Sequence, residues 1–191
     1  MSLIPRLVIG GLFATFWFAG AITAQPEPSP CKLDALPSGI QLQLKQKFGF
    51  WKIQEPETLS ESAQKTWGGV HKPDCPGIAV GLFQDPNTPV YAILLVPAEH
   101  PNDGYTFLVF SRKSGLSSYE LTVVEKSSGP GASNCFLSAV PISRFFDEKS
   151  QKKFQEQASQ AILMVYSSDQ EYESNIYFWA DGRYREEPVD F

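Results

Sequence analysis

Histidine, the side chain used most often for acid–base chemistry, occurs only twice in this sequence, at His71 and His100. Triad catalysis needs a histidine held between a nucleophile and an orienting acid. His100 lies in Glu99-His100-Pro101, which is typical of an exposed loop, and the sequence contains no Gly-x-Ser-x-Gly elbow. We therefore expect both histidines to be surface residues without a catalytic role.

Metal and phosphate chemistry are the next candidates. His71, Asp74 and Cys75 are residue types that bind zinc, but a structural zinc site needs three or four converging ligands and the remaining ligands are not evident. A disulfide at Cys75 would remove one more ligand. The glycine-rich segment Gly129-Pro130-Gly131 lacks the lysine and the helix start of a phosphate-binding loop. We expect no metal, no organic cofactor and no catalytic centre.

Carboxylates are concentrated towards the C-terminus, at Glu171, Glu173, Asp181, Glu186 and Glu187. A glycosidase needs two carboxyl groups across a cleft at a defined separation. Nothing in the sequence places a pair in this way, so solvated strand faces are the simpler interpretation.

Aromatic and arginine side chains are the remaining feature. Tyr177, Trp179 and Tyr184 alternate across a C-terminal hairpin, with Arg183 and Arg185 beside them. Tyr, Trp and Arg are enriched among the energetic anchors of interfaces, so these five residues are the candidate partner-binding surface. The alternative is that the aromatic side chains fill the core and the arginines are ordinary surface charges.

The three cysteines, Cys31, Cys75 and Cys135, allow three disulfide pairings. We favour Cys31 with Cys75, because this bond would tie a loose N-terminal segment to the first strand of the sheet. Cys135 would then be a free, buried thiol. A bond between Cys75 and Cys135 is the second choice.

The first 24 residues have the pattern of a cleavable signal peptide. Arg6 is their only charge, residues 7–19 are apolar, and small residues precede a cut that we place after Ala24. The apolar run is short for a membrane span, which needs roughly 20 residues. We expect a secreted or periplasmic protein with a proline-rich lead-in at residues 25–36, a single domain at residues 37–191, and no membrane contact after cleavage.

The chain from Gln25 onward has 15 basic and 21 acidic residues, a net charge of −6. This charge gives no electrostatic reason to bind nucleic acid or anionic lipid. The function that fits best is a non-catalytic exported protein that binds another envelope or extracellular macromolecule, as an inhibitor or immunity protein does. The alternative is a secreted hydrolase with a site built from scattered carboxylates; a concave pocket with converging titratable groups would favour it.

Two helices near the N-terminus and a series of strands must position these residues. Ile40, Leu42, Leu44 and Phe48 predict a helix from Ser38 that stops at Gly49, and a second helix fits residues 58–67, capped by Thr58 or Ser60 and closed by Gly68-Gly69. Strands are expected at 50–53, 77–83, 90–96, 105–111, 118–126 and 161–166, followed by a hairpin around Asp181-Gly182. We expect residues 127–134 to form a glycine-rich loop that belongs to the candidate partner-binding surface together with the hairpin, and residues 147–159 to form an exposed turn or helical segment. The fold class is α+β, with two short helices packed on an antiparallel meander sheet of six or seven strands.

One segment of this sheet, from Cys75 to Ala92, resembles the strand–loop–strand of FG-GAP and VCBS-type proteins. Gly81, Phe83, Pro89, Tyr91 and Ala92 match the pattern in an ungapped register. Small exported bacterial proteins of unknown function carry a single copy, with a C-terminal hairpin similar to residues 177–184. The resemblance covers about a sixth of the mature chain and implies a hairpin in an exported protein.

The calcium ligands of that pattern are not retained. Its four acidic positions fall on Leu82, Gln84, Pro86 and Val90, which leaves too few oxygen ligands for calcium. The resemblance therefore implies the strand–loop–strand without its metal.

Overall fold

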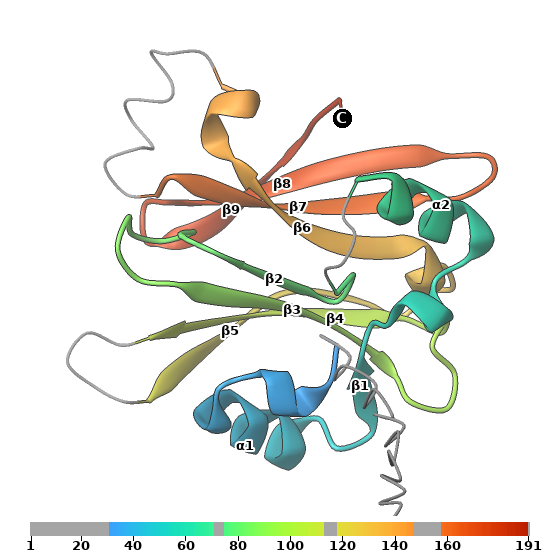
Figure 1. Ribbon diagram of the computed structural model, residues 1–191, viewed down its shortest axis with the longest axis horizontal. Coiled ribbons are helices and arrows are strands. Elements are labelled where there is room, and N and C mark those ends of the chain that lie inside the picture. Colours follow the sequence, from blue (N-terminus) through green and yellow to red (C-terminus); the bar gives the residue numbers. More distant parts are fainter. Residues whose placement is uncertain (1–30, 71–74, 113–117, 147–157, 191) are drawn as a thin grey trace, which may run out of the picture.

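Two antiparallel sheets lie face to face, and one helix covers the outer surface of each (Figure 1). The computed structural model describes residues 31–70, 75–112, 118–146 and 158–190. The layers run in the order α1, first sheet, second sheet, α2. The predicted α+β class, with two N-terminal helices and antiparallel strands, is confirmed.

The first sheet contains β1 (Trp51–Ile53), β2 (Ile78–Gly81), β3 (Val90–Pro97), β4 (Tyr105–Arg112) and β5 (Tyr119–Ser127). The second sheet contains β6 (Cys135–Pro141), β7 (Gln160–Ser167), β8 (Tyr172–Ala180) and β9 (Arg183–Pro188). The helices are α1 (Ser38–Lys47) and α2 (Glu61–Val70), with single 3-10 turns η1 (Leu33–Ala35), η2 (Pro56–Thr58), η3 (Ala132–Asn134) and η4 (Ile142–Arg144).

The strand order explains which edges of the two sheets meet. The first sheet runs β1-β3-β4-β5, with β2 also paired to β3, and the second runs β6-β7-β8-β9. Residues leading into β2 contact β6, where the Leu137 N–H donates to the Pro76 carbonyl at 2.8 Å. The two sheets are therefore hydrogen-bonded to each other along one side of the sandwich. On the other side, β5 and β9 are the outer strands of their sheets.

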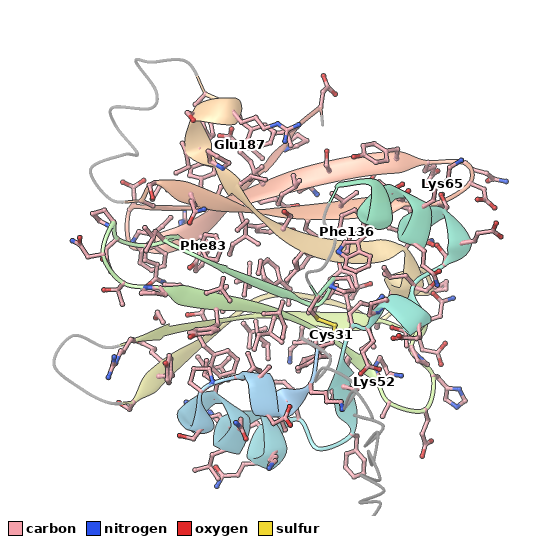
Figure 2. All side chains as sticks on the ribbon, viewed as in Figure 1. Cys31, Lys52, Lys65, Phe83, Phe136 and Glu187 are labelled. Carbon is pink, nitrogen blue, oxygen red and sulfur yellow. A yellow bond between two sulfur atoms is a disulfide. The ribbon has the colours of Figure 1, made fainter. Side chains whose placement is uncertain are left out.

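Alternation along the strands divides the core into layers. In β4, Phe107 and Val109 face the opposing sheet, whereas Leu108 and Phe110 face α1. Phe83 is buried between the sheets, and Phe136 is buried between the second sheet and α2 (Figure 2). Because both sheets are covered on both faces, their central strands are almost continuously apolar.

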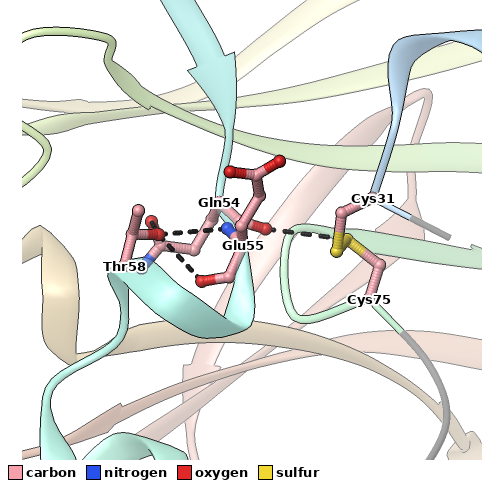
Figure 3. Close-up of a disulfide and its surroundings, with 5 residues drawn as sticks. All are labelled: Cys31, Gln54, Glu55, Thr58 and Cys75. Carbon is pink, nitrogen blue, oxygen red and sulfur yellow. Dashed lines mark hydrogen bonds between the residues drawn. A yellow bond between two sulfur atoms is a disulfide. The ribbon is translucent and has the colours of Figure 1, made fainter. Parts of the chain in front are cut away.

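The N-terminal segment is fixed to the first sheet by the disulfide between Cys31 and Cys75, the pairing favoured from the sequence (Figure 3). Cys135 is free and buried. Beside the disulfide, the backbone carbonyl of Gln54 lies 3.6 Å from the Cys75 sulfur. Gly77 packs so closely here that a Cβ would lie 2.5 Å from the Gln54 carbonyl oxygen, so only glycine fits.

Several sequence expectations need correction. The described residues form nine strands in two sheets, not one sheet of six or seven, and β6 was not among the expected strands. The second helix begins at Glu61 and continues through Gly68 and Gly69 to Val70, although Ser60 caps it as expected, accepting a hydrogen bond from the Ala63 N–H at 3.3 Å. The segment at 147–157 lies outside the described residues.

The hairpin that carries the resemblance is present as β2 and β3, paired from Ile78 opposite Ile93 to Gly81 opposite Val90. In the connecting turn, Asp85 Oδ1 accepts hydrogen bonds from the Asn87 and Thr88 N–H groups at 2.8 Å, so this carboxylate closes the turn. None of the helices in the described part of the chain combines the length and apolar character that a membrane crossing needs.

Candidate functional site

Glu125 accepts hydrogen bonds from two tyrosines that come from opposite sheets. Tyr105, on β4, donates its hydroxyl to Oε1, and Tyr177, on β8, donates to Oε2. The glutamate and Tyr105 are partly exposed, whereas Tyr177 is only 3% exposed and packs edge-on against Phe107 with ring centroids 5.0 Å apart. The two hydroxyls hold the carboxylate in one orientation at the rim of the inter-sheet core.

An irregularity in β5 brings Glu125 to this position. Val123 lies opposite Leu108, but Glu125 lies opposite Phe107, so Val124 is an extra residue in the β4–β5 ladder. Strict alternation from Leu121 would put Glu125 on the face towards α1. The bulge instead turns it to the face that meets the second sheet.

Burial and the Glu125 carboxylate raise the pKa values of the neighbouring tyrosine hydroxyls and of the Cys135 thiol. Burial, reinforced by the hydrogen bond to Glu125, raises the pKa of Tyr105 and of Tyr177 far above the ordinary value of 10.0. Burial, with a smaller contribution from Glu125, raises the pKa of the Cys135 thiol to about 12. At neutral pH the tyrosines are therefore donors, and Cys135 is a thiol and not a nucleophilic thiolate.

These residues line a cavity of about 270 Å³, which we call the Glu125 pocket. Among the described residues, its wall has two carboxylates, three tyrosines, an asparagine and a methionine, and no lysine, arginine or histidine. The lining side chains central to its chemistry are Tyr105, Glu125, Tyr166, Glu173, Asn175 and Tyr177. A negatively charged wall with aromatic groups suits a cation.

The glycine-rich loop forms one rim of the Glu125 pocket through Ser127, Pro130 and Gly131. Asn102 fixes this loop: its Oδ1 accepts hydrogen bonds from the Gly131 N–H and the Ser133 hydroxyl, each at 2.9 Å. Gly131 has a φ of 110°, and a Cβ there would lie 3.2 Å from the Tyr166 ring. Any other residue at this position of the rim would be strained, because of the positive φ and of the nearby Tyr166 ring.

The five residues predicted as a partner-binding surface do not lie on one surface. Tyr177 is buried, and with Trp179 and Tyr184 it faces the first sheet, where Trp179 and Tyr184 pack edge-on at 5.1 Å between centroids. Arg183 and Arg185 occupy the alternate positions of β9, on the other face of the second sheet. Tyr177 as an exposed anchor is therefore wrong; it reaches the Glu125 pocket from inside the fold.

Other candidate residues take simpler roles. Arg185 pairs with Asp181 at 3.1 Å on the exposed hairpin, a geometry that contributes little to stability. His100 is exposed in the loop after β3, whereas His71 and Asp74 lie outside the described residues. Cys75 is in the disulfide and cannot bind a metal. Within the described ranges, no three His, Cys, Asp or Glu side chains are grouped to hold a metal ion.

Four residues of the Glu125 pocket were not among the predicted site residues: Tyr105, Glu125, Tyr166 and Asn175. Glu173 was considered only as part of a solvated strand face. A carboxylate directly after the apolar pair Val123 and Val124 was the available signal for Glu125. Comparison with known proteins adds no further assignment, because no family model, curated protein or solved structure matches this chain.

Proposed function

We propose that this chain is an exported, non-catalytic binding protein whose Glu125 pocket receives a cationic side chain of another macromolecule. The observation that carries the proposal is the Glu125 carboxylate, held by Tyr105 and Tyr177 in a pocket whose described lining has no basic residue. A charge fixed before binding loses little conformational entropy when its partner arrives. The leader-like first 24 residues and the Cys31–Cys75 disulfide support an exported setting.

The size of the pocket favours one side chain over a free metabolite. Its 270 Å³ lies just below the range of about 300–1,000 Å³ that is usual for small-molecule sites. A lysine or arginine could place its charge against Glu125 and Glu173 and its aliphatic stem against Met164 and the tyrosines. The rest of the partner would then contact the loop from Ser127 to Asn134.

A secreted hydrolase is the second candidate, because Glu125 and Glu173 line the same pocket. Two carboxylates are the minimum for glycoside hydrolysis. Against this function, each Glu125 oxygen already accepts a tyrosine hydroxyl, the described pocket lining contains no histidine to activate Ser127, and the Cys135 thiol is protonated.

The test is capture of a partner from envelope extract by the immobilised chain and by two charge-matched variants, Glu125→Gln and Glu187→Gln. Glu187 is exposed and lies opposite Ile176 in the β8–β9 ladder, on the face away from the pocket. The proposal expects the same partner with the native chain and Glu187→Gln, and at least tenfold less with Glu125→Gln. Equal capture by all three would contradict it, and glycan hydrolysis abolished by Glu125→Gln would establish the hydrolase instead.

A further inference from the structure

A second cavity lies on the face of the first sheet that meets α1, between α1 and β1, and we call it the α1–β1 pocket. It has a volume of about 330 Å³, within the range of ligand sites. Six large apolar side chains form its walls: Leu33, Leu44, Phe48, Trp51, Ile53 and Leu95. Such a wall binds hydrocarbon and not a polar solute.

Lysines surround this apolar pocket. Lys32, Lys45 and Lys52 line it, and Glu55 is the one acidic side chain among its described lining residues. Lys47 follows in the last turn of α1, and Asp34 in η1 is the other nearby acid. Residues 31–55 therefore carry four lysines and two carboxylates, whereas residues 56–191 carry 11 basic and 18 acidic side chains. The basic charge is local and is hidden in the net charge of the chain.

Two of the most exposed apolar side chains in the described residues occur in the same region. Phe50 is 89% exposed and Leu42 is 56% exposed. Phe50 is presented by a hydrogen-bonded turn: the Trp51 N–H donates to the Phe48 carbonyl at 2.9 Å, and the Phe50 carbonyl accepts from Ala98 N–H at 3.0 Å. A ring held outward by backbone bonds, beside lysines, is typical of a surface that enters a membrane interface.

We propose that the α1–β1 pocket and its lysines bind anionic phospholipid at a membrane surface. The lysine ammonium groups would contact lipid phosphates, Phe50 would enter the interface, and part of an acyl chain would occupy the pocket. Charge complementarity selects an anionic lipid over a neutral one. The exposed Phe50 selects a membrane over a free fatty acid, which would fill the pocket without using that ring.

The expectation that the mature chain avoids membranes rested on its net charge of −6. That average does not describe the field near the four lysines, because charges beyond about 10 Å are screened at physiological salt.

The test is sedimentation with vesicles, using the chain that begins at Gln25 so that residues 7–19 cannot contribute. All three hydrophobic clusters are built from residues 31–189, so this chain keeps the described fold. We expect binding to vesicles of 3:1 phosphatidylcholine and phosphatidylglycerol, at least tenfold weaker binding to pure phosphatidylcholine, and loss of binding in 0.5 M salt. Equal binding to both vesicles would overturn the proposal.

Variants locate the contact. Lys45→Glu with Lys52→Glu should reduce binding at least tenfold, and Phe50→Ser severalfold at unchanged charge. The control, Lys65→Glu with Arg183→Glu, makes the same change in charge at exposed residues of α2 and β9, and Lys65 lies far from Lys52 in Figure 2. This control should bind anionic vesicles much more strongly than the Lys45→Glu, Lys52→Glu variant. A similar loss of vesicle binding in both double variants would show that only the net charge of the protein matters. That result would overturn the proposed site.

Tryptophan emission separates a membrane from a free fatty acid. Trp51 lines the pocket, so anionic vesicles should shift the emission to shorter wavelength, and Trp51→Phe should remove the shift. The protein is also titrated with laurate below its micellar concentration. If one laurate binds per chain and the protein does not bind vesicles, the pocket is a fatty-acid site and the membrane proposal is wrong. Melting temperatures of all variants establish that each is folded.

Discussion

The Tyr177 hydroxyl reaches from the second sheet to the Glu125 carboxylate of the first, joining residues 52 positions apart in the sequence. The same carboxylate holds Tyr105, so three side chains from β4, β5 and β8 form one polar link beside the apolar inter-sheet core. This link has a structural role and also sets the geometry of the Glu125 pocket.

Removing the Tyr177 hydroxyl should destabilise the protein. Tyr177→Phe keeps the buried ring and its contact with Phe107 but removes a hydrogen bond to a charged group, at a cost of about 1.5–3 kcal/mol. Urea unfolding followed by circular dichroism measures this change. Tyr172→Phe removes a hydroxyl from a side chain that is 46% exposed and should change the unfolding free energy by less than about 0.5 kcal/mol. Equal effects would contradict a specific bond to Glu125.

Alkaline pH should weaken the fold through the same tyrosines. Their folded pKa lies far above the ordinary value of 10.0, so their contribution to stability is complete below pH 10 and is lost as pH rises above it. Glu125 on β5 and Glu186 on β9 disfavour the ionised forms of both phenols, and Cys135 on β6 disfavours that of Tyr105. Melting temperature from pH 8 to 11.5 should fall more steeply for the native chain than for Tyr105→Phe with Tyr177→Phe; parallel curves would refute this linkage.

Gln54 is a second polar connection between the layers, fully buried at the end of β1. Its amide nitrogen donates to the Ala132 carbonyl at 3.1 Å, and its amide oxygen accepts the Thr58 hydroxyl at 3.0 Å. Gln54→Leu removes these partners and leaves the buried Ala132 carbonyl without its side-chain donor, whereas the Thr58 hydroxyl can still donate to the Glu55 carbonyl, so we expect a loss of about 1–3 kcal/mol. Gln46→Leu, at an exposed position of α1, is the control; similar stability of both variants would contradict the assigned role.

Thiol counting tests the disulfide and the buried thiol together. In the unreduced, denatured chain one cysteine, Cys135, should react with a thiol reagent, and in the native protein at pH 8 it should react very slowly because burial raises its pKa to about 12. Replacing Cys31 and Cys75 by alanine removes a bond between residues 44 apart, which the chain-entropy relation values at about 4 kcal/mol. A peptide map by mass spectrometry under non-reducing conditions that showed Cys75 bonded to Cys135 would refute the pairing.

Local signals in the sequence predicted much of this fold. The first helix, the Asp181-Gly182 hairpin and most strands follow from capping, turn residues and apolar periodicity, because these patterns act over a few neighbouring residues. The turn at Asp181-Gly182 indeed has positive φ at both residues, 53° and 75°. The favoured disulfide was also correct.

The division into two sheets and the Glu125 pocket could not be predicted in the same way. An apolar strand looks alike whether a helix or a second sheet covers it, so Tyr177 could be placed on a surface when it lies inside. Glu125 depends on the extra residue Val124, and counting by alternation assigns it to the wrong face. Its partner Tyr177 then comes from a strand 52 residues away, a pairing that no local pattern encodes.

The most direct test of the account is to observe the Glu125 pocket while a cation is added. Tyrosines labelled with ¹³C would be followed by NMR as a short lysine- or arginine-containing peptide is titrated, with a norleucine peptide as the uncharged control. We predict that Tyr105 and Tyr177 signals shift with the cationic peptides only, while Tyr172 stays unchanged, and that Glu125→Gln removes the shifts. Unmoved Tyr105 and Tyr177 signals, or equal shifts in Glu125→Gln, would contradict a cation site at Glu125.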